Sequence, residues 1–508
     1  MAICIDGDSL TLEDFACIAR DQEQVMLSAA ALEKVALSRR VLEEIIATGK
    51  PVYGLNTGFG ALSTSSIPAH DLLNLQKNLV RSHCAGVGVP LARDVTRGLM
   101  LLRANVLAKG CSGVRPEVIQ LLIEMLNKDL VPVIPAKGSV GASGDLAPLS
   151  YLALALIGEG QLDVNGKKIK SAAVLRKHGL QPLRLAEKEG LALINGTQMM
   201  TSQAILNLLA AENLARVADI AGAMTLEAQL GSPTPFFSEI QQVRCHPGQA
   251  ISAANVLQII KDSPLWISHQ GKTRVQDAYS LRCIPQVHGA VRDTLGFIRR
   301  TLETEANSAT ENPLIFPEKG LIISGGNFHG EPVALAMDYL AIAVAELGSI
   351  SERRIDRLVN PATNAGLPAF LAVDGGLHSG FMVAQVTASA LASENKVLAH
   401  PASVDSIPTS ANQEDHVSMG AFAARKAVEV IVNVTAILAI EILVALQALD
   451  FYSLPSSPVI EEVRKTVRGF VPFIARDSRL DLHIDSLSEY IRSEKLVSDV
   501  RGSGCELK

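Results

Sequence analysis

The sequence is poor in charged residues, in aromatic residues and in paired cysteines, and each shortage excludes a class of protein. Only 19% of the 508 residues are charged, 4% are aromatic, and the formal net charge is −6. No run of Lys or Arg forms a stripe that could follow a phosphate backbone, so no nucleic-acid partner is expected. The seven cysteines are scattered, without a Cys-x-x-Cys pair. This argues against a metal site and a disulfide framework and favours a cytoplasmic protein.

Signals for export or membrane insertion are also lacking. The N-terminus has neither the basic start nor the apolar core of a signal peptide. The most apolar long stretch, Val428–Leu449, contains four residues that are costly in hydrocarbon: Glu429, Asn433, Glu441 and Gln447. We therefore expect no membrane partner and predict a helix buried in a water-soluble bundle.

What the sequence does contain is a large apolar share, 48% of the residues. In a chain of this length, such a share predicts a large helical protein with much surface buried between subunits. The longest helices are predicted after residue 200, at 203–229, 287–307, 332–358, 378–398 and 416–449. We expect two domains: an N-terminal domain over residues 1–200 and a bundle of long helices over residues 201–508.

Local signals also divide the N-terminal part. A short strand is predicted at the start, and Thr11, with Asp14 three residues on, should cap an amphipathic helix that continues to Lys50. Asn165-Gly166 predicts the two-residue turn of a hairpin. Further helices are predicted at 94–108, 116–130 and 146–157, with an extended Pro-rich segment at 131–135.

Three glycines punctuate the stretch Gly138-Ser139-Val140-Gly141-Ala142-Ser143-Gly144-Asp145-Leu146. Glycine adopts backbone conformations that other residues avoid, so this spacing permits a tight, strained turn. If the turn is sharp enough, the nitrogen of Gly144 can attack the carbonyl carbon of Ala142. Loss of two waters, one of them with the Ser143 hydroxyl, then leaves a five-membered ring with an exocyclic methylidene. That ring is an electrophile, which none of the twenty side chains provides.

Other interpretations of this loop remain open at this point. The loop lacks the Gly-Lys-Ser/Thr of a phosphate-binding loop and the Gly-x-Gly-x-x-Gly of a dinucleotide site, so no nucleotide cofactor is expected. A nucleophile elbow would need glycine where Asp145 stands. The simplest alternative is a plain loop, with Asp145 as the cap of the following helix.

Further polar residues stand in glycine-punctuated turns or on apolar helix faces. Tyr53 lies in such a turn, where a packed ring with a bonded hydroxyl is the simpler interpretation. His83 continues the face of Leu75 and Leu79, which suits a core histidine as well as a functional one. Asn195 precedes a long helix and could simply cap it. Three polar segments separate the later helices, at residues 275–283, 324–330 and 408–416.

Five motifs stand out together: Tyr53, Ala142-Ser143-Gly144, Asn195, Tyr279-Ser280-Leu281-Arg282 and Asn412-Gln413-Glu414-Asp415-His416. With these motifs the chain closely resembles the aromatic amino acid lyase family, in particular its histidine-specific members, over nearly its whole length. The resemblance implies a mainly α fold, with a long-helix bundle core and a smaller N-terminal α-rich domain, in a fumarase/aspartase-like helical lyase architecture. It also implies a homotetramer whose active sites are shared among three subunits.

The resemblance also implies a cofactor and an activity. The ring made from Ala142, Ser143 and Gly144 would be 4-methylidene-imidazol-5-one (MIO), with Ser143 dehydrated. The expected reaction is the non-oxidative elimination of ammonia from L-histidine to give trans-urocanate, the first step of histidine degradation. Tyr53 is expected to be the base and Tyr279 the second tyrosine of the site, although the sequence alone does not rank the two.

The same resemblance places the substrate-binding residues. Arg282 is expected on the substrate carboxylate, because a guanidinium pairs with it through two hydrogen bonds. Asn195 and Gln276 would donate to the MIO oxygen or hold the substrate amine and carboxylate, and Phe328 would pack on the substrate or the MIO. His83, Met382 and Glu414 match positions that line the imidazole pocket, where Glu414 would bond the ring N–H. A helix-capping Glu414 and a core-filling Met382 are the simpler alternatives.

Three competing functions follow from the same residues. A tyrosine or phenylalanine ammonia-lyase, or an aminomutase, would use the same electrophile and differ in product. A helical scaffold or binding protein whose loop never cyclised would retain the mass of both waters. A fumarase-type lyase should carry a Gly-Ser-Ser loop, which this sequence lacks.

Overall fold

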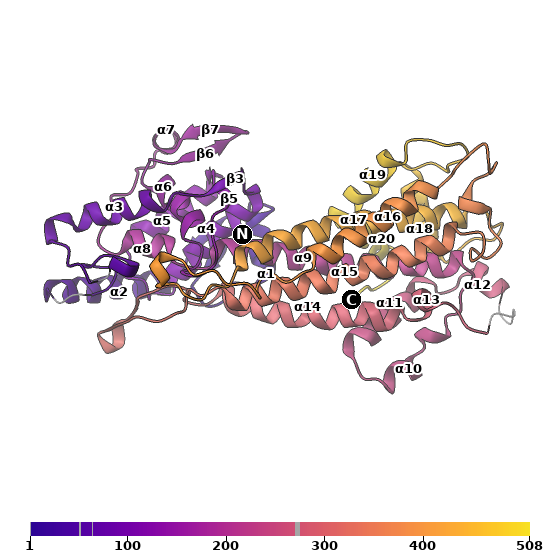
Figure 1. Cartoon of the computed structure of the whole chain (residues 1–508), viewed down its shortest axis with the longest axis horizontal. Helices are drawn as coiled ribbons and strands as arrows, with labels where there is room; N and C mark the ends of the chain where they lie inside the picture. Colours follow the sequence, from indigo (N-terminus) through magenta and orange to yellow (C-terminus); the bar gives the residue numbers. More distant parts are fainter. Residues whose placement is uncertain (1, 50–51, 63, 270–274) are drawn as a thin grey trace. The chain divides into compact units, whose positions relative to one another are not determined.

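The computed structural model describes residues 2–49, 52–62, 64–269 and 275–508, which are mostly helical (Figure 1). The mainly α fold class predicted from the sequence is therefore confirmed. The chain divides into two compact units. The first unit contains Met1–Leu206, Arg299–Asp338 and Pro401–Arg425, and the second contains Asn207–Ile298, Tyr339–His400 and Lys426–Lys508.

This division differs from a single cut at residue 200. The first segment ends nearby, at Leu206, but residues 299–338 and 401–425 also join the first unit. Contacts between distant parts of the chain are the reason. The amide of Ile315 donates to the carbonyl oxygen of Cys111 at 2.8 Å. The hydroxyl of Ser418 donates to the carbonyl oxygen of Gly141 at 3.0 Å. The predicted polar segments at 324–330 and 408–416 consequently lie in the first unit.

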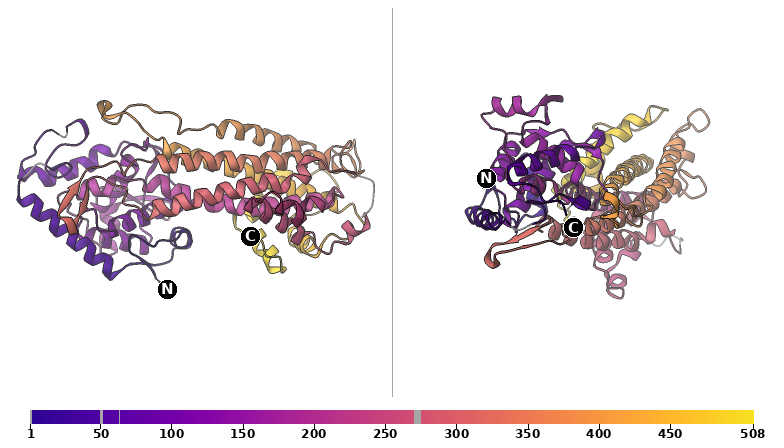
Figure 2. Two further views of the ribbon diagram at one scale, coloured as in Figure 1. Left: turned by 90° about the horizontal axis from the view of Figure 1, so that it is seen from below. Right: turned by 60° about the vertical axis from the view of Figure 1, so that its left-hand side comes forward.

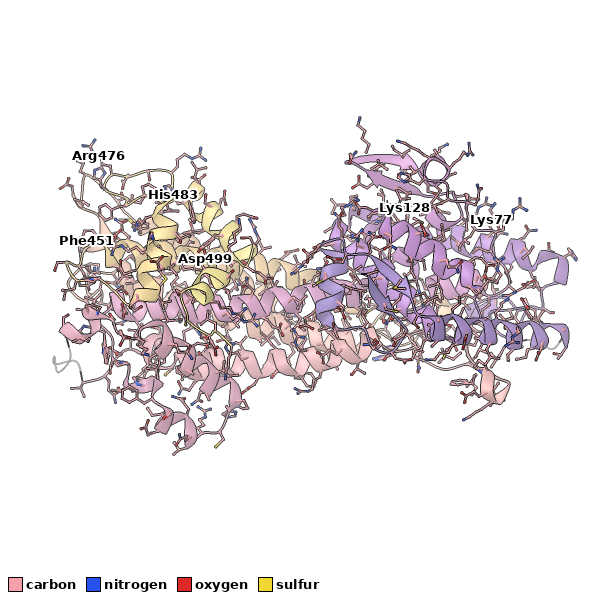
Figure 3. The ribbon with its side chains drawn as sticks, turned by 180° about the vertical axis from the view of Figure 1, so that it is seen from behind. Lys77, Lys128, Phe451, Arg476, His483 and Asp499 are labelled. Atoms are coloured by element: carbon pink, nitrogen blue, oxygen red, sulfur yellow. The ribbon has the colours of Figure 1, made fainter. Side chains whose placement is uncertain are left out.

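The first unit is built mainly from helices around a central helix, α4, in which every residue from Val95 to Leu107 is buried. Lys77 on α3 and Lys128 after α5 lie on the outside of this unit (Figure 3). The helices are α1 (Leu12–Ala19), α2 (Ala29–Ala47), α3 (Leu72–His83), α4 (Arg93–Ala108), α5 (Pro116–Asn127), α6 (Leu146–Leu156), α7 (Ser171–Lys177) and α8 (Glu189–Ile194), with the 3-10 turns η1 (Gly60–Leu62), η2 (Ala69–Asp71) and η4 (Pro317–Lys319).

Short strands connect these helices. The pairs are β1 (Ile3–Ile5) with β2 (Val25–Leu27) in parallel, and β3 (Val87–Pro90) with β5 (Pro135–Lys137), β4 (Val131–Pro132) with β6 (Gln161–Val164), β6 with β7 (Lys167–Lys170), and β8 (Leu314–Phe316) with β9 (Leu321–Ile323), all antiparallel. The predicted hairpin turn is confirmed. Asn165 and Gly166 join β6 to β7 with φ of 52° and 76°, as a two-residue turn of this kind requires.

The predicted single helix from Thr11 to Lys50 was wrong in one respect, because the segment contains two helices separated by β2 (Lys50 itself lies outside the described residues). Thr11 caps α1 as predicted, its side chain accepting a hydrogen bond from the Asp14 amide. The chain then turns at Gln22, which has a φ of 62°. Ser28 starts α2 by accepting from the Ala31 amide. A second cap within the amphipathic pattern was the signal for this break.

The long predicted helices are present and run side by side through the second unit (Figures 1 and 2). Two begin later than predicted. The residue Gly380, with φ of 56°, precedes one of them, and Met419, also with φ of 56°, precedes the other. The long helices are α9 (Gln198–Ala228), α14 (Ile284–Ala306), α15 (Glu331–Val359), α16 (Met382–Leu398) and α17 (Gly420–Leu449).

Buried polar contacts join these helices within the second unit. The His288 ring on α14 donates from Nδ1 to Asp219 on α9 at 2.8 Å, and Arg354 on α15 pairs with Glu441 on α17 at 2.5 Å. Shorter helices complete the unit: η3 (Thr234–Phe236), α10 (Ser238–Gln242), α11 (Pro247–Ile259), α12 (Pro264–Ser268), α13 (Tyr279–Arg282), α18 (Pro458–Arg468), α19 (Leu480–Arg492) and α20 (Lys495–Gly502).

Two helices, α15 and α17, are long and apolar enough to cross a membrane by length and composition. Their most apolar windows are 67% and 72% buried within the chain, as in the core helices of a bundle. The predicted buried stretch Val428–Leu449 belongs to α17, and its Glu441 and Gln447 have no exposed surface. This agrees with the helix predicted to be buried in a bundle.

Candidate functional site

The glycine-punctuated loop before α6 is the tight turn that its sequence predicts. Gly138, Gly141 and Gly144 have φ of 138°, 70° and 70°, in the region that favours glycine. A Cβ on Gly144 would lie 2.2 Å from the carbonyl oxygen of Gly196. Gly144 and Gly196 form a parallel bridge, and the Asp145 amide donates to the Gly196 oxygen at 2.7 Å. No larger residue fits at position 144.

The other side of the loop is held by segments from much later in the chain. The carbonyl oxygen of Gly141 accepts from the amide of Gly330 and from the hydroxyl of Ser418, both at 3.0 Å. The carbonyl oxygen of Val140 accepts from the amide of Met419 at 2.8 Å. The conformation of residues 138–145 is therefore imposed from both sides and is not a property of the loop alone.

Three of the predicted site residues meet at Ser143. Its hydroxyl donates to Glu414 Oε1 at 2.5 Å, and its carbonyl oxygen accepts from Asn195 Nδ2 at 2.9 Å. The Asn195 Oδ1 in turn accepts from the Asn312 amide at 2.7 Å. The side chain of Asn195 thus binds the loop, and the simpler interpretation as a helix cap was wrong.

Glu414 is positioned by its own segment of chain. Its Oε2 accepts from the Thr409 hydroxyl at 2.6 Å, and the backbones of Thr409 and Glu414 form an antiparallel bridge. Between them, Ser410, Ala411 and Asn412 all have φ between 52° and 65°, a conformation that costs a non-glycine residue about 1–2 kcal/mol. Since α17 begins only at Gly420, Glu414 does not cap a helix.

The other predicted residues of the first unit make local contacts. The Tyr53 hydroxyl oxygen accepts from the Gly60 amide at 3.3 Å, and its ring packs edge-on against Phe59. His83 ends α3 with Nδ1 at 2.8 Å from the Leu79 carbonyl oxygen. Nδ1 therefore carries a proton, which leaves Nε2 as the acceptor of the neutral ring. Phe328 is half-buried in the turn after β9.

The remaining predicted residues belong to the second unit. Gln276, Tyr279 and Arg282 line a pocket of about 570 Å³. Tyr279 is 71% exposed, and the Arg282 guanidinium lies 4.5 Å from the centre of its ring, a cation–π contact. Met382, the first residue of α16, is 39% exposed and is not among the residues that line this pocket.

Asp145 follows the loop and is completely buried. It occupies the N-cap position of α6, but its side chain makes no cap hydrogen bond, so the alternative interpretation of Asp145 as a cap was wrong. Its carboxylate accepts instead from the Ser139 hydroxyl at 2.8 Å and from the Met200 amide at 2.9 Å. Burial raises the pKa of this carboxyl to about 7, although both hydrogen bonds act to lower it.

The raised pKa of Asp145 predicts a pH dependence of folding stability. Between pH 3.8, its ordinary pKa, and pH 7, the folded state retains a proton that the unfolded state has lost. The contribution of Asp145 to stability is therefore fully present below pH 3.8 and is lost as the pH rises to 7. Across this window the stability difference between wild type and Asp145→Asn should change by up to about 1.4 kcal/mol per pH unit.

Thermal unfolding at pH 5, 6, 7 and 8 measures this difference. The stability of the wild type relative to Asp145→Asn should fall as the pH rises to about 7 and then stay constant. Asp477→Asn is the matched control, because Asp477 is exposed and backbone hydrogen bonds lower its pKa. Parallel curves for wild type and Asp145→Asn would contradict the raised pKa.

Sequence reasoning missed two charged residues behind Asn195. Arg103 on α4 has no exposed surface, and its Nη1 donates to the Asn195 carbonyl oxygen at 2.8 Å. Its Nη2 lies 3.3 Å from Glu311, which is 1% exposed. The available signal was an arginine within the otherwise apolar stretch of α4, where a buried charge requires a partner.

Comparison with known proteins gives one consistent result. The family model described as aromatic amino acid lyase matches residues 10–469. A histidine ammonia-lyase of Caldanaerobacter subterraneus subsp. tengcongensis is 52% identical over 507 residues, covering 100% of this chain and 99% of the relative. The crystal structure of histidine ammonia-lyase from Trypanosoma cruzi matches with a TM-score of 0.92 and 44% identity, covering 99% of this chain and 96% of that one.

A tyrosine aminomutase from Streptomyces globisporus also matches, with a TM-score of 0.95 and 39% identity over 100% of both chains. The family model covers most of the chain, and the relatives match over nearly its full length. The chain therefore belongs to the aromatic amino acid lyase family.

Proposed function

We propose that this protein is an L-histidine ammonia-lyase, which eliminates ammonia from L-histidine to give trans-urocanate. The observation that carries the proposal is the position of Ser143, with its hydroxyl on Glu414 and its carbonyl oxygen on Asn195 in a strained glycine loop. The substrate is suggested by relatives of about 52% identity that are named histidine ammonia-lyases. The elimination needs an electrophile as well as a base, because the β-proton is unactivated and ammonia leaves poorly.

The residues present fit an MIO group made from Ala142, Ser143 and Gly144. Only glycine fits at position 144, where its nitrogen would attack the Ala142 carbonyl carbon. The Ser143 carbonyl group would become the exocyclic carbonyl of the ring, and Asn195 already donates to its oxygen. When formed, the group supplies an electrophilic methylidene, while the surrounding side chains bind and orient the substrate.

In this proposal, Tyr53 removes the β-proton. Its phenol oxygen is held by the Gly60 amide, so its position in the turn is defined before substrate binds. His83 and Glu414 bind the imidazole. The free Nε2 of His83 can accept one imidazole N–H, and the Glu414 carboxylate is an acceptor beside Ser143. Met382 and Phe328 provide apolar contact with the ring.

The substrate carboxylate is assigned to Arg282, with Gln276 and Tyr279 beside it. The Nε of Arg282 is buried and finds no hydrogen-bond partner among the residues that the structure describes. A guanidinium that lines a pocket and has an unpaired N–H can bind a carboxylate, which would accept two parallel hydrogen bonds from it. This pocket belongs to the second unit.

A homotetramer with active sites shared among subunits would complete each site. The support is a set of exposed apolar side chains on long helices, where a soluble protein usually has polar ones. They include Tyr339 and Ile342 on α15 and Val383, Val386 and Val397 on α16, which are 43–68% exposed. The exposed Tyr279 would likewise be covered in an assembly. We assign the protein to the cytoplasm, where its unpaired cysteines stay reduced.

A substrate panel tests this function. The purified protein is incubated separately with L-histidine, L-tyrosine and L-phenylalanine, and the ultraviolet absorbance of the conjugated acid is followed, together with the intact mass. Urocanate from histidine alone, with a mass lower by two waters, is expected. Turnover of tyrosine or phenylalanine would retain the electrophile but contradict the imidazole pocket. A full mass and no turnover would favour a scaffold whose loop never cyclised.

A further inference from the structure

Three charged side chains in the first unit form a cluster that is completely or almost completely buried. Arg103 on α4 and Lys188 before α8 have no exposed surface, and Glu311 is 1% exposed. Glu311 pairs with both cations, at 3.3 Å to Arg103 Nη2 and 3.2 Å to Lys188 Nζ. Buried ion pairs contribute little to stability in general, because desolvation opposes their attraction. The cluster is therefore better explained by what its three side chains hold in place.

The cluster (Arg103, Lys188 and Glu311) fixes Asn195 from two directions. Arg103 Nη1 donates to the Asn195 carbonyl oxygen at 2.8 Å. Glu311 immediately precedes Asn312, whose amide donates to Asn195 Oδ1 at 2.7 Å. Since Oδ1 accepts an amide proton, the carboxamide has only one possible orientation, with its NH₂ toward the Ser143 carbonyl oxygen.

The guanidinium also lies directly against the backbone that pairs with the loop. A Cβ on Gly196 would lie 2.8 Å from Arg103 Nη1, and Gly196 forms the bridge with Gly144. Burial lowers the pKa of Arg103 to about 10, so the side chain remains charged at neutral pH. The planar fork of the arginine bonds the Asn195 carbonyl through Nη1 and Glu311 through Nη2 at the same time, with donor directions that a lysine does not fix.

We propose that Arg103 is a positioning residue for the reaction, which acts through Asn195 by holding its carboxamide against the Ser143 carbonyl oxygen. The inference rests on the proposed function, because it assumes that this oxygen becomes part of the electrophile. Arg103 does not touch the substrate in this proposal. Its loss should therefore lower kcat and slow the cyclisation of the loop, with little change in KM.

The test is a double-mutant cycle of Arg103→Lys and Asn195→Ala. The readouts are the fraction of loop peptide that has lost two waters, kcat and KM for histidine, and the melting temperature. We expect Arg103→Lys to lower kcat about tenfold in the wild-type background and about twofold or less in the Asn195→Ala background, because both changes remove the same interaction. The cyclised fraction should show the same non-additivity.

Two further variants keep the test decisive. Arg354→Lys in the second unit is the matched control, since Arg354 is also completely buried and pairs with Glu441. It should lower the melting temperature while leaving cyclisation and kcat unchanged in both backgrounds. If Arg103→Lys does not fold, Glu311→Asp shortens the carboxylate with its charge intact, and it should be non-additive with Asn195→Ala in the same way.

The outcomes separate this inference from the proposed function. Suppose that the wild type is cyclised and active, and that the separate kcat losses of Arg103→Lys and Asn195→Ala multiply in the double mutant. This result would overturn the role of Arg103 and leave the lyase function standing. An equal effect of Arg354→Lys on cyclisation would also overturn it, because the loss would then follow general stability. A wild type without loss of two waters and without turnover would overturn both.

Discussion

Replacing Ser143 with alanine should give a protein that folds but releases almost no ammonia from histidine. The substitution removes the hydroxyl that must leave as water, so the methylidene cannot form. The backbone carbonyl of residue 143 remains, and so the hydrogen bond from Asn195 can persist. Removing one member of a unit that acts together lowers kcat by orders of magnitude, here on the order of 10⁴-fold or more.

Three measurements decide this result: histidine turnover, the mass of the loop peptide and the melting temperature. Ser150→Ala on α6 is a suitable control, because that hydroxyl is buried and donates to the Ala147 carbonyl oxygen within its own helix. The control should lose two waters and turn over histidine, whereas Ser143→Ala should do neither. Turnover at the wild-type rate by Ser143→Ala would exclude the proposed electrophile.

Glu414→Gln should lower histidine turnover by about 10²- to 10⁴-fold, the usual contribution of a positioned acid–base or charge-stabilising group. The glutamine retains an oxygen for the Thr409 hydroxyl, and the backbone bridge between residues 409 and 414 does not involve the side chain. We therefore expect the melting temperature and the assembly to change little. What the variant loses is the negative charge that would face the imidazole.

Histidine kinetics should be accompanied by the mass of the loop peptide, because the Ser143 hydroxyl donates to this same carboxylate. Full cyclisation with slow turnover would assign Glu414 to the substrate step. The exposed neighbour Asp415, changed to Asn, should retain normal turnover. If Glu414→Gln impaired assembly and left turnover per intact oligomer unchanged, the carboxylate would have a structural role.

Local patterns predicted those elements that depend on local forces. The turn at Asn165-Gly166 was predictable because its two positive φ values suit these residues, and the long helices were predictable from their apolar periodicity. The return of residues 299–338 and 401–425 to the first unit was not, because hydrogen bonds between distant residues such as Ser418 and Gly141 cause it. Periodicity contains no information about such pairs.

The site shows the same limit. Ser143 and Glu414 are 271 residues apart, and they were connected beforehand only through the resemblance to a family. A helix cap was the simpler alternative for Asp145, because its position before α6 is typical of one. In the structure, its carboxylate instead accepts hydrogen bonds from the Ser139 hydroxyl and the Met200 amide. The role of Arg103 depends on partners at positions 195 and 311, which no spacing rule relates to it.

In the proposed function, the way in which the glycine loop is held also determines when during biosynthesis the protein can become active. The carbonyl oxygens of Val140 and Gly141 are bound by residues 330, 418 and 419. Ser418 lies 277 residues beyond Gly141, so the ribosome must have made most of the chain before the turn is closed. A nascent or truncated polypeptide would therefore contain an inert Ala-Ser-Gly sequence, and only a chain that has completed its fold would acquire the reactive group that we propose.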